Sequence, residues 1–255
     1  MAIRVLVHGG MGRMGSQSVQ AVVAEDGLEL CGIVDRLPQD ASLASVPYFT
    51  NVEQAVKKSF AQVMIDFSLA EAAIIAIETA LKNGVNVVSG TTGIAAKDID
   101  RLGQIAVENK VCFMTAANFA IGAVLMMSFA KTAAKYLDRA EIIEMHHDKK
   151  QDAPSGTAIA TAKAMLQERL QGFTRPDDDT FKSRGEDFNG IAVHAVRLPG
   201  YLARQEVHFG ATGQTLTITH NTITRDCFMP GIMLSVKEVV KHKGLIKGLE
   251  AILNL

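Results

Sequence analysis

Short apolar runs alternate with segments of helical periodicity through the first half of the chain. Mostly apolar runs at residues 3–8, 28–34, 63–67, 85–89 and 111–115 predict strands, and near-continuous apolar runs are typical of a parallel sheet covered on both faces. The segments between them, at residues 12–24, 52–57, 69–83 and 97–109, predict helices. Repeated strand–helix–strand units of this kind indicate an α/β domain with a doubly wound, Rossmann-type parallel sheet.

The pattern changes after residue 118. A predicted helix at residues 121–136 leads to a strand at 141–147 and a second helix at 155–170, and the polar stretch 172–188 predicts a long surface loop. Segments 192–197, 206–211 and 215–220 alternate as antiparallel strands with one open face do, and Pro230 can open a final helix that runs to residue 241. We therefore expect a first domain at 1–118, rejoined by residues 226–255, and a second, α+β domain at 119–225.

Composition narrows the possible partners. The chain has 26 Lys and Arg against 27 Asp and Glu, so it carries no overall field that would attract nucleic acid or an anionic membrane. Its longest apolar stretch is shorter than the roughly 20 residues that a membrane span needs. Three widely separated cysteines offer no metal-binding spacing and suit reduced thiols in the cytoplasm. We expect a cytoplasmic protein without a nucleic-acid or membrane partner and without a metal.

A glycine-rich turn follows the first predicted strand and opens the first predicted helix. It reads Gly9-Gly10-Met11-Gly12-Arg13-Met14-Gly15. Its early glycines permit a tight turn and a close approach of a pyrophosphate to backbone N–H groups, while Gly15 permits close helix–strand packing. A glycine turn alone can be merely structural. Here the second strand ends at Asp35, where a carboxylate can bind the adenosine ribose, and this context favours dinucleotide binding.

Cofactor choice depends on two adjacent residues. Asp35 favours NADH by pairing with the ribose 2′-hydroxyl, whereas Arg36 can pair with the 2′-phosphate of NADPH. The alternative for Arg36 is a solvated loop charge. We predict that NADH and NADPH are both accepted.

Two further turns follow predicted strands of the same sheet. Gly90-Thr91-Thr92-Gly93 comes after the strand at 85–89, and Ala116-Ala117-Asn118-Phe119 comes after the strand at 111–115. Open α/β sheets bind ligands at the carboxyl ends of their strands, so both turns are candidates to hold the nicotinamide. Either one can also be an ordinary turn.

The segment from His146 to Ala158 concentrates side chains that suit acid–base chemistry. Two imidazoles and two ammonium groups lie within five positions, between a predicted strand and a helix start at Pro154-Ser155-Gly156-Thr157. A helix N-terminus favours an anion, and His and Lys beside it suit a small carboxylate substrate that also receives a proton. The alternative is a solvated basic loop.

Taken in order, these motifs resemble the 4-hydroxy-tetrahydrodipicolinate reductase (dihydrodipicolinate reductase) family of lysine and diaminopimelate biosynthesis, over nearly the whole chain. The most specific part is Glu144 to Ala158, which has the pattern Glu-x-His-His-x-x-Lys-x-Asp-Ala-Pro-Ser-Gly-Thr-Ala. The resemblance implies reduction of (4S)-4-hydroxy-2,3,4,5-tetrahydrodipicolinate by NADH or NADPH, with loss of water. It also implies a homotetramer in which the N-terminal domain binds the cofactor and closes over a substrate-binding, oligomerising C-terminal domain.

The resemblance assigns roles to particular residues. His146 would be the proton donor and Lys150 a second catalytic donor, with His147, Gly156 and Thr157 as contacts to the dicarboxylate substrate. Arg225 resembles the family's arginine near the junction of the two domains.

Two positions depart from the family pattern. Leu69-Ala70 stands where members often carry a Pro-containing turn, and Arg204 stands where many have His. Two other functions remain open at this point: a different two-domain NAD(P)-dependent dehydrogenase, such as an aspartate or sugar dehydrogenase, and a non-catalytic dinucleotide sensor.

Overall fold

The computed structural model describes residues 2–174 and 183–255 and resolves them into two compact units. The first unit takes in the chain up to Ala120 together with Phe228–Asn254, and the second takes in Ile121–Cys227. Each unit has its own sheet and its own apolar core.

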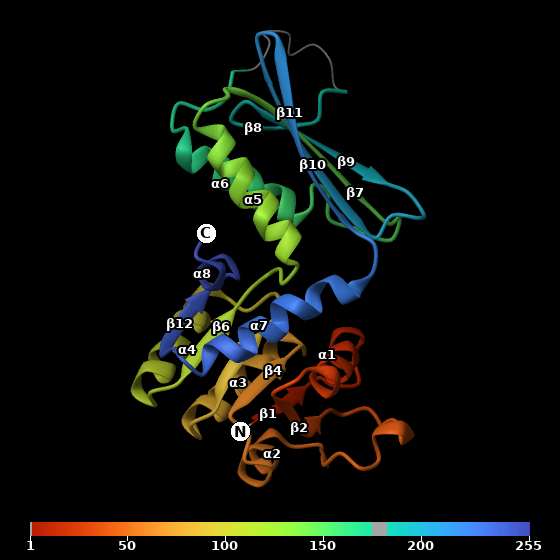
Figure 1. The fold of residues 1–255 in the computed structure, drawn as a ribbon, viewed down its shortest axis with the longest axis vertical. Helices are drawn as coiled ribbons and strands as arrows, with labels where there is room; N and C mark the ends of the chain where they lie inside the picture. Colours follow the sequence, from red (N-terminus) through yellow and green to blue (C-terminus); the bar gives the residue numbers. More distant parts are fainter. Residues whose placement is uncertain (1, 175–182) are drawn as a thin grey trace. The chain divides into compact units, whose positions relative to one another are not determined.

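A seven-stranded sheet forms the centre of the first unit, with strand order β12-β6-β5-β4-β1-β2-β3 (Figure 1). Every neighbouring pair is parallel. Apart from β12, the order is that of the Rossmann fold, so the predicted fold class is confirmed. The strands are β1 (Ile3–His8), β2 (Leu28–Val34), β3 (Tyr48–Phe49), β4 (Val63–Asp66), β5 (Asn86–Ser89), β6 (Cys112–Thr115) and β12 (Gly244–Lys247).

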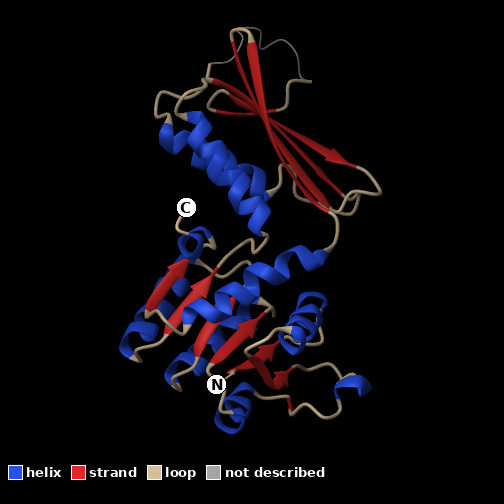
Figure 2. Cartoon of the chain, viewed as in Figure 1, coloured by secondary structure: helices blue, strands red, loops and turns tan. Residues whose placement is uncertain are grey.

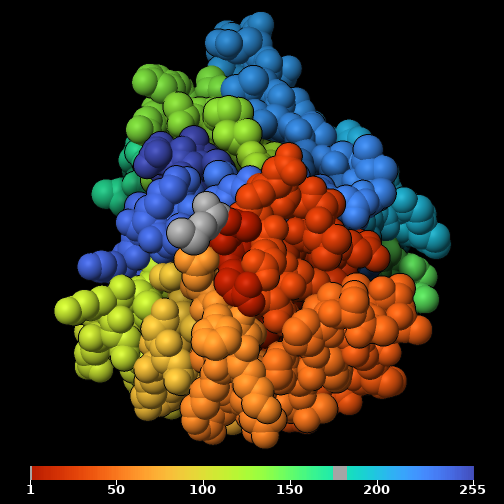
Figure 3. Space-filling view, turned by 60° about the horizontal axis from the view of Figure 1, so that its bottom comes forward, coloured from red at the N-terminus to blue at the C-terminus, as the bar shows by residue number. Residues whose placement is uncertain are grey.

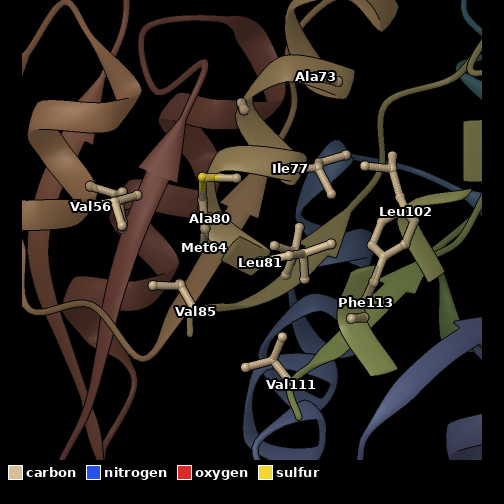
Figure 4. Packing of buried hydrophobic residues seen from close by; sticks show 14 of the residues in the cluster. Val56, Met64, Ala73, Ile77, Ala80, Leu81, Val85, Leu102, Val111 and Phe113 are labelled. Carbon is tan, nitrogen blue, oxygen red and sulfur yellow. The ribbon is translucent and has the colours of Figure 1, made fainter. Parts of the chain in front are cut away.

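Helices cover both faces of this sheet, which explains the unbroken apolar runs of its strands. On one face α2 (Val52–Ser59), α3 (Ala70–Lys82) and α4 (Ala96–Glu108) enclose a core in which Met64, Leu81 and Phe113 are fully buried (Figure 4). On the other face α1 (Arg13–Ala24) packs beside α7 (Met229–Val239), and α7 contacts β4, β5 and β6. The remaining helices of this unit are the short η1 (Ala41–Leu43) and α8 (Glu250–Leu253).

Two strands of the first unit were not predicted. β3 has only two residues, and β12 is a four-residue, partly exposed edge strand with two apolar side chains, so neither is long enough to make an apolar run. β12 pairs with β6 and so ties the C-terminal segment into the sheet. Figure 3 shows the surface of the segment that follows β2, in orange, beside that of the N-terminal strand and helix, in red.

The second unit contains a five-stranded sheet with strand order β11-β10-β7-β9-β8. Its strands are β7 (Arg139–His146), β8 (Glu186–Phe188), β9 (Ile191–Arg197), β10 (Ala203–Ala211) and β11 (Gln214–Thr222). β10 is antiparallel to both of its neighbours, as predicted, but β9 runs parallel to β7. The prediction of an antiparallel strand at 192–197 is therefore wrong for this pair. The long connection between β7 and β9 contains a helix, and such a crossover returns the chain in the same direction.

Helices α5 (Ile121–Ala134) and α6 (Gly156–Glu168) pack together along one face of this sheet (Figure 2). Ile142, Val207 and Phe209 point into the core beneath them, whereas Glu141 and Ile143 alternate onto the opposite, open face. The predicted loop at 172–188 ends in β8, and its central residues 175–182 lie outside the described part of the chain. Across the described residues, the structure contains no helix with the length and apolar character of a membrane span.

Candidate active site

In the glycine turn after β1, the fold requires glycine at some positions but not at Gly12. Gly9 has a φ of +76°, and a Cβ there would lie 2.5 Å from the carbonyl oxygen of Phe67. At Gly15 a Cβ would lie 1.9 Å from the carbonyl oxygen of Gly9. At Gly12 the nearest atom would be that same oxygen at 3.3 Å, and φ is an ordinary −73°. The turn itself therefore needs Gly9 and Gly15, whereas a Cβ at Gly12 requires the Gly9 carbonyl to move by only a few tenths of an ångström.

The first turn of α1 fits a pyrophosphate. Its N-cap is Gly12, and no side chain caps the helix there. The first N–H groups of a helix have no intrahelical partner, and together with the helix dipole they favour an anion. Arg13 and Met14 occupy this turn, while Gly10 packs against β2, where its Cβ would lie 2.5 Å from Ile33 Cγ2.

Asp35 lies just after β2, beside the glycine turn. One carboxylate oxygen accepts a hydrogen bond from the Met11 N–H at 2.7 Å, and the other accepts from the N–H groups of Arg36 and Leu37 at 2.7 and 3.0 Å. These bonds orient the carboxylate next to the turn, as expected for a residue that binds the adenosine ribose. The Arg36 side chain is exposed beside it.

The buried carboxylate of Asp66, which was not predicted as a site residue, links the ends of three strands through hydrogen bonds. Asp66 has no exposed surface and accepts hydrogen bonds from His8 Nδ1, Ser68 Oγ, Ser89 Oγ and Thr91 Oγ1 at 2.7 to 2.8 Å. Burial acts to raise the pKa of Asp66, but the hydrogen bonds, led by that from His8, lower it on balance. The sequence does contain a signal for this cluster, because each of three mostly apolar strands ends in a polar residue: His8 in β1, Asp66 in β4 and Ser89 in β5.

The two turns predicted to hold the nicotinamide are linked through Phe67. A Cβ at Gly90 would lie 2.2 Å from Phe67 Cε1, and the rings of Phe67 and Phe119 meet edge to face with centroids 6.2 Å apart. Asn118 shapes the second turn, because its Oδ1 accepts the Ala120 N–H at 2.9 Å. The structure thus brings these turns together at the carboxyl ends of β4, β5 and β6. Of their other residues, Ala116 is buried, and Thr92 and Ala117 are exposed.

In the second unit, the candidate proton donor ends strand β7. His146 Nδ1 lies 2.5 Å from Oε2 of Glu144, a side chain with no exposed surface. Arg197 binds both oxygens of that carboxylate, at 2.7 and 2.9 Å, and the Ser155 N–H donates to it at 3.0 Å. Burial acts to raise the pKa of Glu144, yet the hydrogen bonds from His146 and Arg197 lower it on balance. In the sequence Glu144 belongs to the motif but has no predicted role, and the pairing of Arg197 with its carboxylate was not predicted.

The other predicted substrate residues lie in the same loop. Lys150 Nζ donates to both carboxylate oxygens of Asp152 at 2.8 Å, and His147 is half-buried. Gly156 and Thr157 open α6, whose N-cap Ser155 accepts the Ala158 N–H on its Oγ at 3.2 Å. A Cβ at Gly156 would meet no atom within 4 Å, so this helix end is sterically open.

Two arginines singled out from the sequence lie elsewhere in the second unit. Arg204 Nε donates to Glu206 Oε1 at 2.8 Å on the open face of the sheet, whereas the neighbouring Gln205 and Glu144 point to the helix-covered face. The departure at position 204 is therefore on the opposite side of the sheet from Glu144. Arg225 begins the short helix η2 (Arg225–Phe228).

The comparison with known families agrees with this geometry. Residues 3–119 match the family described as "Dihydrodipicolinate reductase, N-terminus", and residues 122–253 match "Dihydrodipicolinate reductase, C-terminus". The chain belongs to the dihydrodipicolinate reductase family. The resemblance found in the sequence is thus confirmed.

Individual relatives match over their full length. A 4-hydroxy-tetrahydrodipicolinate reductase of Dehalococcoides mccartyi is 43% identical over 260 residues, covering 99% of each chain. That of Geobacillus kaustophilus is 43% identical over 265 residues, covering 100% of each. A dipicolinate-bound dihydrodipicolinate reductase from Paenisporosarcina sp. TG-14 superposes with a TM-score of 0.90 at 37% identity, over 98% of this chain and 99% of that one. A probable dehydrogenase from Thermotoga maritima, 13% identical with a TM-score of 0.69, shares the fold.

Proposed function

We propose that the protein reduces (4S)-4-hydroxy-2,3,4,5-tetrahydrodipicolinate to tetrahydrodipicolinate, with NADH or NADPH and with loss of water, in lysine and diaminopimelate biosynthesis. The observation that carries the proposal is the loop after β7. It holds an imidazole, an ammonium group and an open helix N-terminus together, in a chain that matches this reductase family from end to end. A small dicarboxylate that takes up a proton suits that combination.

The first unit carries the residues that would bind the cofactor. Residues 9–14 and the first turn of α1 would hold the pyrophosphate, and Asp35 with Arg36 the adenosine ribose. The turns at 90–92 and 116–119 would hold the nicotinamide. When bound, the reduced nicotinamide supplies the hydride.

The second unit carries the residues that would bind and protonate the substrate. His146 donates the proton, and Lys150, His147 and the N–H groups of Gly156 and Thr157 bind the two carboxylates. Lys150 already holds a carboxylate, that of Asp152, which is 60% exposed. A substrate carboxylate has the same chemistry and can take its place.

Replacement of Arg36 by Ala should weaken NADPH binding about tenfold or more and leave NADH binding nearly unchanged. The reason is that only NADPH carries the phosphate to which a guanidinium makes a charge-assisted hydrogen bond. Fluorescence titration of the variant with each cofactor measures the effect. An equal loss for both would show that Arg36 does not bind the phosphate.

We further propose that the protein acts in the cytoplasm as a homotetramer. The open face of the five-stranded sheet supports assembly, because Ile143 and Met145 are only half-buried there within a single chain. Light scattering on the purified protein should give four times the mass of one chain. A mass equal to that of one chain would contradict the proposal.

A spectrophotometric assay with enzymatically generated substrate and NADH or NADPH tests the proposed reaction. Turnover supports the reductase. Turnover only with other carbonyl substrates would indicate a different two-domain dehydrogenase. Cofactor binding without any turnover would indicate a dinucleotide sensor.

A further inference from the structure

We propose that Glu144, held by Arg197, is a positioning residue that fixes the ring of His146, so that Nε2 is the atom that delivers the proton. This inference rests on the proposed function for the identity of the reaction. Its structural part, which of the two ring nitrogens carries the hydrogen in the neutral ring, can be measured without turnover.

The contacts settle which ring nitrogen Glu144 engages. Oε2 lies 2.5 Å from Nδ1 of His146, and Glu144 has no surface through which water could compete. Arg197 donates one N–H to each carboxylate oxygen, at 2.7 and 2.9 Å. A carboxylate paired in this bidentate way stays ionised and can only accept hydrogen bonds. Nδ1 of His146 must therefore be the donor.

That hydrogen bond determines the chemistry left to Nε2. In the charged ring both nitrogens carry hydrogen, and the Nδ1–H is engaged by Glu144. The transferable proton is then the one on Nε2: the Nε2–H bond breaks, its electron pair stays on the ring, and the proton goes to the substrate. The neutral ring that remains keeps its hydrogen on Nδ1, still bonded to Glu144. An orienting carboxylate plays the same part toward the histidine of the Ser-His-Asp triad.

The same carboxylate also fixes the start of the substrate-binding helix. Glu144 Oε1 accepts the N–H of Ser155, the N-cap of α6, and Arg197 Nη2 donates to the carbonyl oxygen of Asp152 at 2.6 Å. The pair therefore holds the proton donor and both ends of the loop that carries Lys150 in one rigid arrangement. If Glu144 had only a structural role, it would still make these anchoring contacts. Its effect on the reaction would then not depend on which nitrogen of His146 carries the hydrogen.

The chain supplies a matched control on the same strand. Glu141 also contacts a histidine and an arginine: its Oε2 lies 3.0 Å from His194 Nε2, and its Oε1 accepts from Arg184 at 2.6 Å. This second trio lies on the open face of the sheet and outside the proposed site. A substitution at Glu141 removes the same kind of contact without touching His146.

The first measurement needs no variant. In the full-length protein labelled with ¹⁵N-histidine, the nitrogen chemical shifts of His146 at a pH where the ring is neutral should report hydrogen on Nδ1. The signal is assigned among the seven histidines by its loss in His146→Gln. Hydrogen on Nε2 instead would overturn the proposal, whatever the activity of the enzyme.

The second measurement uses Glu144→Gln. An amide can donate to Nδ1, so the neutral ring should shift toward hydrogen on Nε2, and kcat should fall by about 10- to 100-fold with KM and cofactor affinity within about threefold of wild type. Glu141→Gln should change neither the tautomer of His146 nor kcat. If kcat in folded Glu144→Gln stays within threefold of wild type, or if Glu141→Gln causes an equal loss while its mass by light scattering equals that of the wild type, the proposal is wrong.

Glu144→Asp keeps the charge opposite Arg197 but shortens the side chain away from Nδ1. It should therefore fold and still lose kcat, even if Glu144→Gln does not fold. Full activity in folded Glu144→Asp would contradict the proposal. Absence of turnover in the wild-type protein would instead refute the proposed function and leave the nitrogen shifts as the test of the geometry.

Discussion

His146→Gln should lower kcat by about 10²- to 10⁴-fold, because glutamine keeps a polar side chain of similar reach but its amide hydrogens are too weakly acidic to be transferred. NADH affinity should stay at the wild-type value, since the residues proposed to bind the cofactor belong to the first unit and His146 to the second. Steady-state kinetics beside a cofactor titration measure both quantities.

Lys150→Ala serves as the companion variant. It should lower kcat/KM, because it removes a positive charge proposed to bind the dicarboxylate, and it should also leave NADH affinity unchanged. If the loop were only a solvated basic loop, kcat and kcat/KM would change by less than about threefold for either substitution. That result in both variants would show that the loop after β7 is not the active site.

Gly12→Val should abolish cofactor binding and leave the protein folded. A Cβ at this position requires the Gly9 carbonyl oxygen, 3.3 Å away, to move by only a few tenths of an ångström, but the branched side chain would occupy the space in front of the α1 amides that a pyrophosphate needs. Titration of NADH fluorescence, together with a thermal unfolding curve, distinguishes loss of the site from loss of the fold.

Gly15→Ala is the control for Gly12→Val, because it should disturb the fold itself. Its Cβ would lie 1.9 Å from the backbone oxygen of Gly9, so the turn itself must shift, and we expect a loss of about 3 kcal/mol in the free energy of unfolding. NADH affinity unchanged in Gly12→Val would mean that the glycine turn serves the fold alone.

The α/β architecture was predictable because the strands of the first unit are buried on both faces. Near-continuous apolar runs such as Val5–Val7 in β1 predict a buried strand, and the glycine turn marks the first strand–helix junction. The edge strands β3 and β12 were not predictable, since a short, half-exposed strand makes no apolar run. The parallel direction of β9 was missed because strand direction depends on the connection, which periodicity within the strand does not report.

The candidate site was predictable where its residues are neighbours in sequence. His146, Lys150 and Gly156 lie within one loop, and a local motif captures them. Arg197 pairs with Glu144 from a strand 53 residues further along the chain, and His8 reaches Asp66 across 58 residues. Only the register of the sheets brings such pairs together, so no local pattern reveals them.

The most direct test of the proposed reaction follows the hydride itself. NADH that carries deuterium at its transferable position is incubated with the protein and enzymatically generated 4-hydroxy-tetrahydrodipicolinate, and the product is examined by mass spectrometry and NMR. The expected product is tetrahydrodipicolinate with a single deuterium at ring carbon 4, formed in proportion to the NADH consumed. NADH oxidation that leaves the product unlabelled, or no product at all, would contradict it.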